Sequence, residues 1–261
     1  MIRSLALKSA IAMLPAAPAR APLPVVTFGA GAIDARLGGG LARGALHEFY
    51  AAAAEDSSAA AVFAVALAMR GVSRGRPVVW IREKQCAARV GHLYAAGLVE
   101  LGFDPDDLFL VDAPDTRAVL RAGADIVKCG DVGAVIIEPY GKALLLDLTA
   151  SRRLSMAAAV SGVLTLMLRV DAEPMPSAAQ TRWQVASAPS SPFAANAPGN
   201  AAFDIVLLRH RSGIPGFEAH LEWNRDTKSF GPIFAPLSGR VPADAVFGTD
   251  QARSVIRRRA A

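Results

Sequence analysis

The sequence predicts an α/β fold with a mostly parallel sheet, flanked by helices and extended by antiparallel strands near the C-terminus. Two observations support this. From Ala45 to Val170, short apolar runs alternate with helical segments, which is typical of parallel strands covered on both faces. From Thr181 the helical segments stop and strand-like runs follow one another through turns, which favours antiparallel pairing.

The alternating part contains five predicted strands with helices between them. The strands are short and rich in Val, Ile and Leu, at Ala45–Tyr50, Pro77–Ile81, Leu108–Asp112, Ala134–Glu138 and Val163–Val170. The helices are predicted at Ser57–Val72, at about Ala87 to Leu101, from Asp115 onward and at Ser151–Ser161. The Asp115 carboxylate can cap the third of these helices.

The second part contains four strand-like runs, TRWQVASA, FDIVLLRH, FEAHLEWN and SFGPIFAP. The turn-forming segments RSGIPG and NRDTK join the last three runs. A segment rich in Pro, Asn and Gly, PSSPFAANAPGN, separates the first two and is predicted to be a loop.

Composition indicates a globular protein. Of the 261 residues, 52% are hydrophobic and 20% are charged, and a chain of this length buries a core without disulfides or metals. Cys86 and Cys129 fall in predicted helices without metal-ligand spacing, so we expect buried, reduced thiols and a cytoplasmic location. No apolar run is long enough to predict a transmembrane helix. The net charge of +5 permits contact with nucleic acid or an acidic partner but requires neither.

The most informative stretch is GGGLARGALHEFYAAAAEDSSAAAVFAVALA, in which a Gly-rich turn, a strand, a loop and a long helix follow in order. This is the place where a phosphate-binding loop of the pattern GxxxxGK[ST] would lie. The eight positions here read AAAAEDSS. Ala51 and Asp56 replace the two glycines, Ser57 replaces the lysine, and Ser58 alone keeps the type of residue that the pattern requires.

These replacements predict a chain that binds no nucleotide or metal and is not an enzyme. The side chains of Ala51 and Asp56 hinder the close backbone approach that glycine allows. The Asp56 carboxylate also opposes phosphate, at about 4 kcal/mol per unit charge for a separation of about 4 Å and an effective dielectric near 20. We expect Asp56, Ser57 and Ser58 to cap the following helix instead. On the strand before the loop, His47 and Glu48 are expected to be structural.

The ordered motifs resemble the RecA/KaiC-like ATPase core, from about Val25 to Gly231. The segment before the loop matches the family's approach to its phosphate-binding loop, with Asp34, Gly39, Gly40, Gly44 and Glu48 in corresponding places. VGAVIIE resembles the Walker B strand, with Glu138 at the position of its aspartate, and Glu83 is the candidate for the family's catalytic carboxylate. Without a phosphate-binding loop, the resemblance implies that both acids are relics.

The missing loop and the ending RWQV…LLRHRSGIPGFEAHLEW most resemble the ImuA family. The resemblance implies an accessory role in SOS-induced translesion synthesis and mutagenesis, through binding to ImuB, an inactive Y-family polymerase homologue. RecA, DNA and further copies of the chain remain open as partners. Three alternatives also stay open: a SulA-like inhibitor of cell division, a divergent ATPase that takes its lysine from Lys84 or a neighbouring subunit, and a DNA-binding modulator of RecA.

The predicted organisation is an N-terminal segment and linker at 1–24, a RecA-like core at 25–236 and a C-terminal extension at 237–261. The extension ends in a basic segment with apolar anchors that suits docking to a partner or to DNA, namely Arg253, Val255, Ile256, Arg257, Arg258 and Arg259. The family's first DNA loop would fall near Lys142, Arg152 and Arg153, which either touch a DNA backbone or are simply solvated. Its second would fall at Asp171–Gln180, which has two acidic residues and no basic one.

Overall fold

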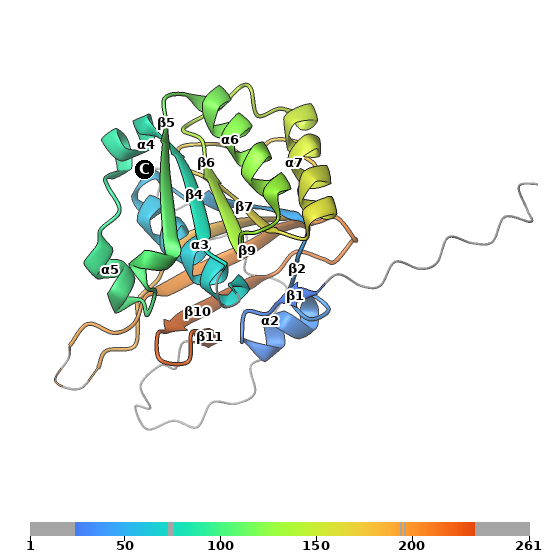
Figure 1. Cartoon of the computed structure of the whole chain (residues 1–261). Coiled ribbons are helices and arrows are strands. Elements are labelled where there is room, and N and C mark those ends of the chain that lie inside the picture. The colour runs from blue at the N-terminus through green and yellow to red at the C-terminus, as the bar shows by residue number, and fades with distance from the viewer. Residues whose placement is uncertain (1–23, 73–75, 194, 196, 233–261) are drawn as a thin grey trace, which may run out of the picture.

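A computed structural model describes residues 24–72, 76–193, 195 and 197–232. Within these ranges the strands form one nine-stranded sheet, in the order β11-β10-β9-β8-β3-β7-β6-β4-β5, and a separate two-stranded sheet (Figure 1). The described residues therefore share one large sheet, as the alternation of strands and helices predicts.

The parallel half of the sheet contains the strands of the alternating region. These are β3 (Leu46–Ala51), β4 (Val78–Glu83), β5 (Leu108–Ala113), β6 (Ala134–Glu138) and β7 (Leu164–Arg169). The antiparallel half consists of β9 (Ala202–His210), β10 (Glu218–Asn224) and β11 (Ser229–Pro232). Between the halves, β8 (Thr181–Ser187) pairs parallel with β3 and antiparallel with β9. The mostly parallel sheet with an antiparallel extension is confirmed, although the extension begins one strand later than predicted.

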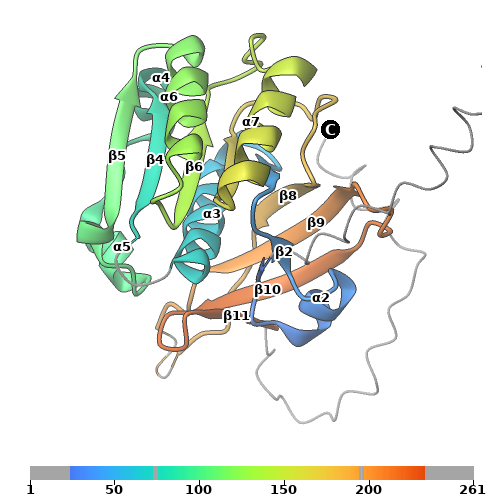
Figure 2. The ribbon, with the colours of Figure 1, turned by 45° about the vertical axis from the view of Figure 1, so that its right-hand side comes forward.

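Helices cover both faces of the parallel half (Figure 2). Helix α3 (Ser57–Gly71) packs on one face, where its Phe63 shares a core with Trp80 of β4 and Trp183 of β8. Helices α6 (Thr116–Cys129) and α7 (Leu148–Ser161) pack on the other face, over Ile137 of β6. Strand alternation explains this division, because successive side chains point to opposite faces of a sheet.

Local signals define several boundaries. The Asp115 carboxylate accepts a hydrogen bond from the Ala118 amide at 2.8 Å, as predicted, and Asp147 caps α7 in the same way through the Ala150 amide at 2.7 Å.

Before β3 lie a small antiparallel pair, β1 (Val25–Val26) and β2 (Leu41–Ala42), and the short helix α2 (Gly31–Arg36) between them. Gly40 is required there, because a Cβ atom would lie 2.3 Å from the Val26 carbonyl oxygen.

Two predictions were wrong. The single helix expected at about 87–101 is two short helices, α4 (Lys84–Val90) and α5 (Ala95–Glu100), because Gly91 ends α4 with φ +91°. Cys86 is buried as expected, but Cys129 is exposed, because it is the last residue of α6 and lies beyond the part that packs on the sheet.

Among the described residues, no helix combines the length and the apolar character needed to cross a bilayer. The predicted boundaries at 1–24 and 237–261 fall almost entirely outside the described residues, so the division into segments stays a prediction.

Candidate functional site

The loop between β3 and α3 occupies the position of the missing phosphate-binding motif. After Ala51 the chain makes a short 3-10 turn, η1 (Ala54–Asp56), and then enters α3 directly. Across residues 51–58, all of which are described, no residue has a positive φ angle. The loop therefore lacks the left-handed glycine conformations that turn successive backbone amides toward an anion.

The Asp56 carboxylate faces β8. Asp56 is buried, and its Oδ1 accepts hydrogen bonds from both the amide and the hydroxyl of Ser187, each at 2.8 Å. The Ala52 amide also donates to the Val185 carbonyl, at 2.9 Å. The loop is thereby fixed to the end of β8 by its own polar groups, and a buried negative charge lies beside the first turn of α3.

The prediction that these residues cap α3 was wrong for all three side chains. Asp56 is the residue at the N-cap, but its carboxylate points to Ser187 and makes no capping bond. The Ser57 hydroxyl donates back to the Ala54 carbonyl at 2.6 Å, and Ser58 is exposed. The missing cap is explained by the 3-10 turn. In this turn Asp56 has φ −86° and ψ 2°, whereas a capping residue typically has an extended backbone.

The two candidate acids do not form a pair. Glu138 ends β6 and accepts from Trp80 Nε1 and Arg82 Nε, each at 2.8 Å, and from Arg82 Nη2 at 3.2 Å. Glu83 ends β4 and accepts from the Thr116 hydroxyl at 2.8 Å and the Tyr140 amide at 3.2 Å. Each carboxylate thus has its own set of donors.

The two acids also lie on opposite faces of the sheet. Glu138 continues the α3 face, two residues after Ile136, whereas Glu83 continues the α6 face, two residues after Ile81. Burial raises the pKa of Glu138, while its ion pair with Arg82 acts in the other direction. Burial likewise raises the pKa of the neighbouring Cys86 thiol to about 12. These residues form a closed structural network and leave no shared metal-binding oxygen pair.

His47 and Glu48 of β3 are buried and have internal partners. His47 Nε2 contacts the Ala42 carbonyl at 2.9 Å, so this nitrogen carries the proton, and Nδ1 accepts from the Thr181 hydroxyl at 2.7 Å. Burial lowers the pKa of His47 to about 4. The Glu48 carboxylate pairs with Arg182 of β8 at 2.9 Å. Both contacts join β3 to neighbouring segments, which agrees with the structural role expected of these residues.

The two loops predicted to correspond to the family's DNA loops are tied to the sheet by Arg169, which is buried, and by Arg182, which is half-buried. Arg169 of β7 donates through Nη2 to the Gly141 carbonyl at 3.0 Å and to the Lys142 carbonyl at 3.3 Å. Arg182 donates to the Ser177 hydroxyl at 2.9 Å and to the Met175 carbonyl. Both guanidinium groups also lie over the ring of Tyr50, at 5.5 and 5.9 Å from its centroid. Sequence reasoning missed both arginines, although for Arg169 a charged residue within the apolar run VLTLMLRV was a usable signal.

The predicted basic candidates are separated by the structure. Arg153 lines a groove between α6 and α7, Arg152 lines a second hollow on the other side of α7, and Lys142 lies in the loop after β6. Arg253, Val255, Ile256, Arg257, Arg258 and Arg259 lie outside the described residues. Among the described residues no group of three or more His, Cys, Asp and Glu side chains is placed to hold a metal ion.

Comparison with known proteins identifies the family. ImuA proteins from two strains of Caulobacter vibrioides, NA1000 / CB15N and ATCC 19089 / CIP 103742 / CB 15, are each 35% identical to this chain over 212 residues. The match covers 76% of this chain and 83% of each relative. The chain belongs to the ImuA family. No family model matches it.

The fold of this member of the ImuA family is confirmed by a solved structure. The RadB recombinase superposes with a TM-score of 0.54 and 16% sequence identity, covering 80% of this chain and all of the recombinase chain. At this identity the likeness shows the fold alone. The protein is therefore a RecA-like member of a DNA-damage-related family, and its loop after β3 departs from the phosphate-binding pattern.

Proposed function

We propose that this protein is a non-catalytic RecA-like adaptor that supports error-prone translesion synthesis in the SOS response by binding an ImuB-type inactive polymerase homologue. The observation that carries the proposal is the Asp56 carboxylate, buried beside the first turn of α3 and held by Ser187. A RecA-like ATPase needs phosphate at this position.

The electrostatic cost of placing a phosphate beside Asp56 supports the absence of catalysis. A unit negative charge about 4 Å from Asp56 would cost about 4 kcal/mol at an effective dielectric near 20. That energy corresponds to a roughly thousandfold loss of affinity. Ser57 stands where the motif has its lysine, so no cation at this position offsets the penalty.

The second part of the proposal concerns the partner. The segment Ser238–Ala261 ends with RSVIRRRAA, which combines three consecutive arginines with the apolar pair Val255 and Ile256. Such a segment suits an acidic groove with an apolar floor, because the arginines add affinity and specificity once the apolar residues are buried. We place the main contact with the ImuB-type protein in this segment, and the protein works in the cytoplasm.

The test is a binding titration of purified ImuB-type protein against the full chain and against a chain ending at Leu237. We expect the truncated chain to lose binding while it still unfolds in one cooperative thermal transition. A matched control replaces Arg257, Arg258 and Arg259 by lysine, which keeps the charge and should retain most of the affinity. Undiminished binding by the truncated chain would contradict the proposed docking segment.

A further inference from the structure

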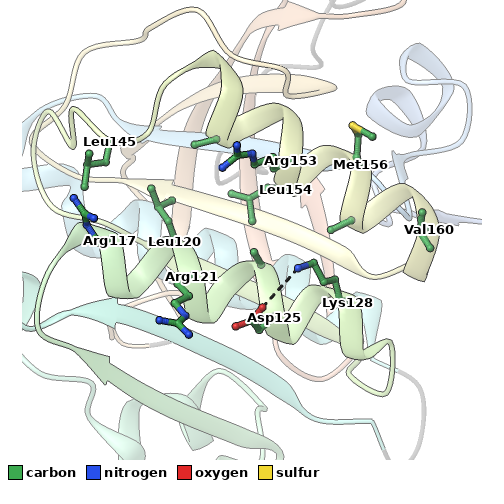
Figure 3. Close-up of a pocket in the computed structure, with 13 residues that line it drawn as sticks. Arg117, Leu120, Arg121, Asp125, Lys128, Leu145, Arg153, Leu154, Met156 and Val160 are labelled. Atoms are coloured by element: carbon green, nitrogen blue, oxygen red, sulfur yellow. Dashed lines mark ion pairs between the residues drawn. The ribbon is translucent and has the colours of Figure 1, made fainter.

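The outer surface of helices α6 and α7 is hollowed by a groove of about 840 Å³. Figure 3 shows the two helices along its sides, with Arg117 and Leu145 at one end and Val160 at the other. Most of the lining is aliphatic or basic, and it consists of Arg117, Leu120, Arg121, Ala124, Asp125, Lys128, Leu145, Ala150, Arg153, Leu154, Met156, Ala157 and Val160.

The groove exposes large aliphatic side chains to water. Val160 is 86% exposed, Met156 is 63% exposed and Leu145 is 48% exposed. Single exposed apolar residues are ordinary, but several of them around one groove mark an interaction surface. These side chains contribute nothing to the core, so their burial against a partner would be a net gain of apolar contact.

The groove is also strongly basic. It contains four cationic side chains and one acid, Asp125, which already pairs with Lys128 at 3.6 Å. Among the described residues, Arg117, Arg121 and Arg153 have no ion-pair partner. Across α7, a second hollow of about 380 Å³ shares Met156 and contains Arg152, Arg209 and Arg211 with no acidic residue. The surface on both sides of α7 therefore favours an acidic partner.

We propose that this groove binds an acidic amphipathic helix of a different protein. A helix laid along α6 and α7 would bury one apolar stripe against Leu120, Leu154 and Val160. Its acidic residues would meet Arg117, Arg121 and Arg153 at the sides. The spacing fits, because both helices present lining residues three or four positions apart, which is the pattern that packs ridges into grooves.

Charge argues against occupation by this chain itself. Residues 1–23 contain three basic residues and no acidic one, and residues 233–261 contain five arginines against two aspartates. Both segments would place arginine or lysine against the arginines of the groove. A second copy of the same face would do so as well, because a symmetric contact brings like surfaces together.

The aliphatic lining argues for protein over nucleic acid. Sites for single-stranded nucleic acid combine basic residues with aromatic side chains on which bases stack, and no aromatic residue lines this groove. Leucine, methionine and valine gain most from other apolar side chains. The proposal does not depend on the C-terminal docking segment, so either can fail while the other holds.

The experiment is a selection on the immobilised full chain from a displayed library of random peptides of about 16 residues, long enough for roughly four helical turns. Recovered peptides are labelled and titrated by fluorescence polarisation. We expect them to be acidic, with apolar residues three or four apart, and to bind less tightly as salt rises. Val160→Asp and Arg153→Glu should each weaken binding by about tenfold or more, as expected for central interface residues.

Matched controls place the same changes outside the groove. Tyr94→Asp alters an exposed apolar residue, and Arg225→Glu reverses an exposed charge on the turn after β10. All four changed residues are exposed, so the variants should fold like the parent chain. The proposal is overturned if no acidic peptide is recovered or if the groove and control variants bind alike. It is also overturned if duplex DNA of about 20 base pairs, roughly two helical turns, binds with the same dependence on Arg153 while the peptides do not.

Discussion

The polar side chains at the strand ends have partners within the protein, whereas those on the outer face of α6 and α7 are exposed to solvent. At the carboxyl ends of β3, β4 and β6, where a RecA-like ATPase holds nucleotide, the acids have internal donors: Asp56 has Ser187, Glu138 has Arg82, and Glu83 has Thr116. Across the outer face of α6 and α7, by contrast, arginines and aliphatic side chains are exposed around an open groove.

The difference is the basis for the groove that we propose as a binding surface. A buried polar group stabilises a fold only when it is hydrogen-bonded, and the three acids at the strand ends meet that requirement without a ligand. The surface of α6 and α7 lacks such internal partners, so a partner gains most there. The chain keeps the RecA-like sheet, and the groove between α6 and α7 is the surface that we propose for an additional partner.

The largest expected change in stability follows from removing the buried ion pair at the strand ends. Glu138→Ala leaves Arg82 and the Trp80 indole without their acceptor in the core, and we expect the free energy of unfolding to fall by about 3–5 kcal/mol. Urea denaturation measures this. The control is Asp125→Ala, which removes the exposed pair with Lys128 and should cost less than about 1 kcal/mol. Equal losses in the two variants would contradict the contrast between the regions.

A smaller loss of folding stability is expected on acidification. The folded pKa of His47, about 4, lies below the ordinary value of 6.5, so on acidification the unfolded chain takes up the proton first. Stability from the neutral imidazole is therefore complete above pH 6.5 and is lost as the pH falls toward 4, by up to about 3 kcal/mol. Denaturation of the parent and of His47→Gln at several pH values measures the difference. An identical acid dependence in both proteins would exclude His47 as the cause.

Chemical labelling of the two cysteines compares the two regions without a substitution in the protein. Cys86 is buried beside Glu138, and burial raises the pKa of its thiol to about 12, whereas Cys129 is exposed at the end of α6. A thiol reagent should therefore label one cysteine quickly in the native protein and both after denaturation. Cys129→Ser should abolish the fast reaction. Fast labelling in that variant would show that the strand ends open to solvent.

Much of the fold follows from local sequence patterns. Apolar runs predict the strands, and Asp115 and the interruptions rich in Gly and Pro predict where helices and turns begin. The division between α4 and α5 was missed, because Gly91 interrupts a segment that otherwise looks like one helix. The parallel pairing of β8 with β3 was also missed, because the sequence of a strand does not show which strands lie beside it.

The candidate site was predictable in outline only. The replacement of the phosphate-binding pattern by AAAAEDSS is visible in the sequence. The contact between Asp56 and Ser187 is not, because it joins residues 131 positions apart. The groove likewise depends on the packing of α6 against α7, so its lining residues are scattered along the sequence and give no local signal. Only Arg153 was a candidate beforehand, and for contact with DNA.

We expect the loop that holds Asp56 to exclude nucleotide. The most direct test is a calorimetric titration of the purified full chain with Mg·ATP up to about millimolar concentration, with a RecA-type ATPase as the positive control. We expect no saturable heat from this protein. Saturable binding in the range of about 1–100 μM would contradict it, and would mean that Asp56 does not oppose phosphate where the structure places it.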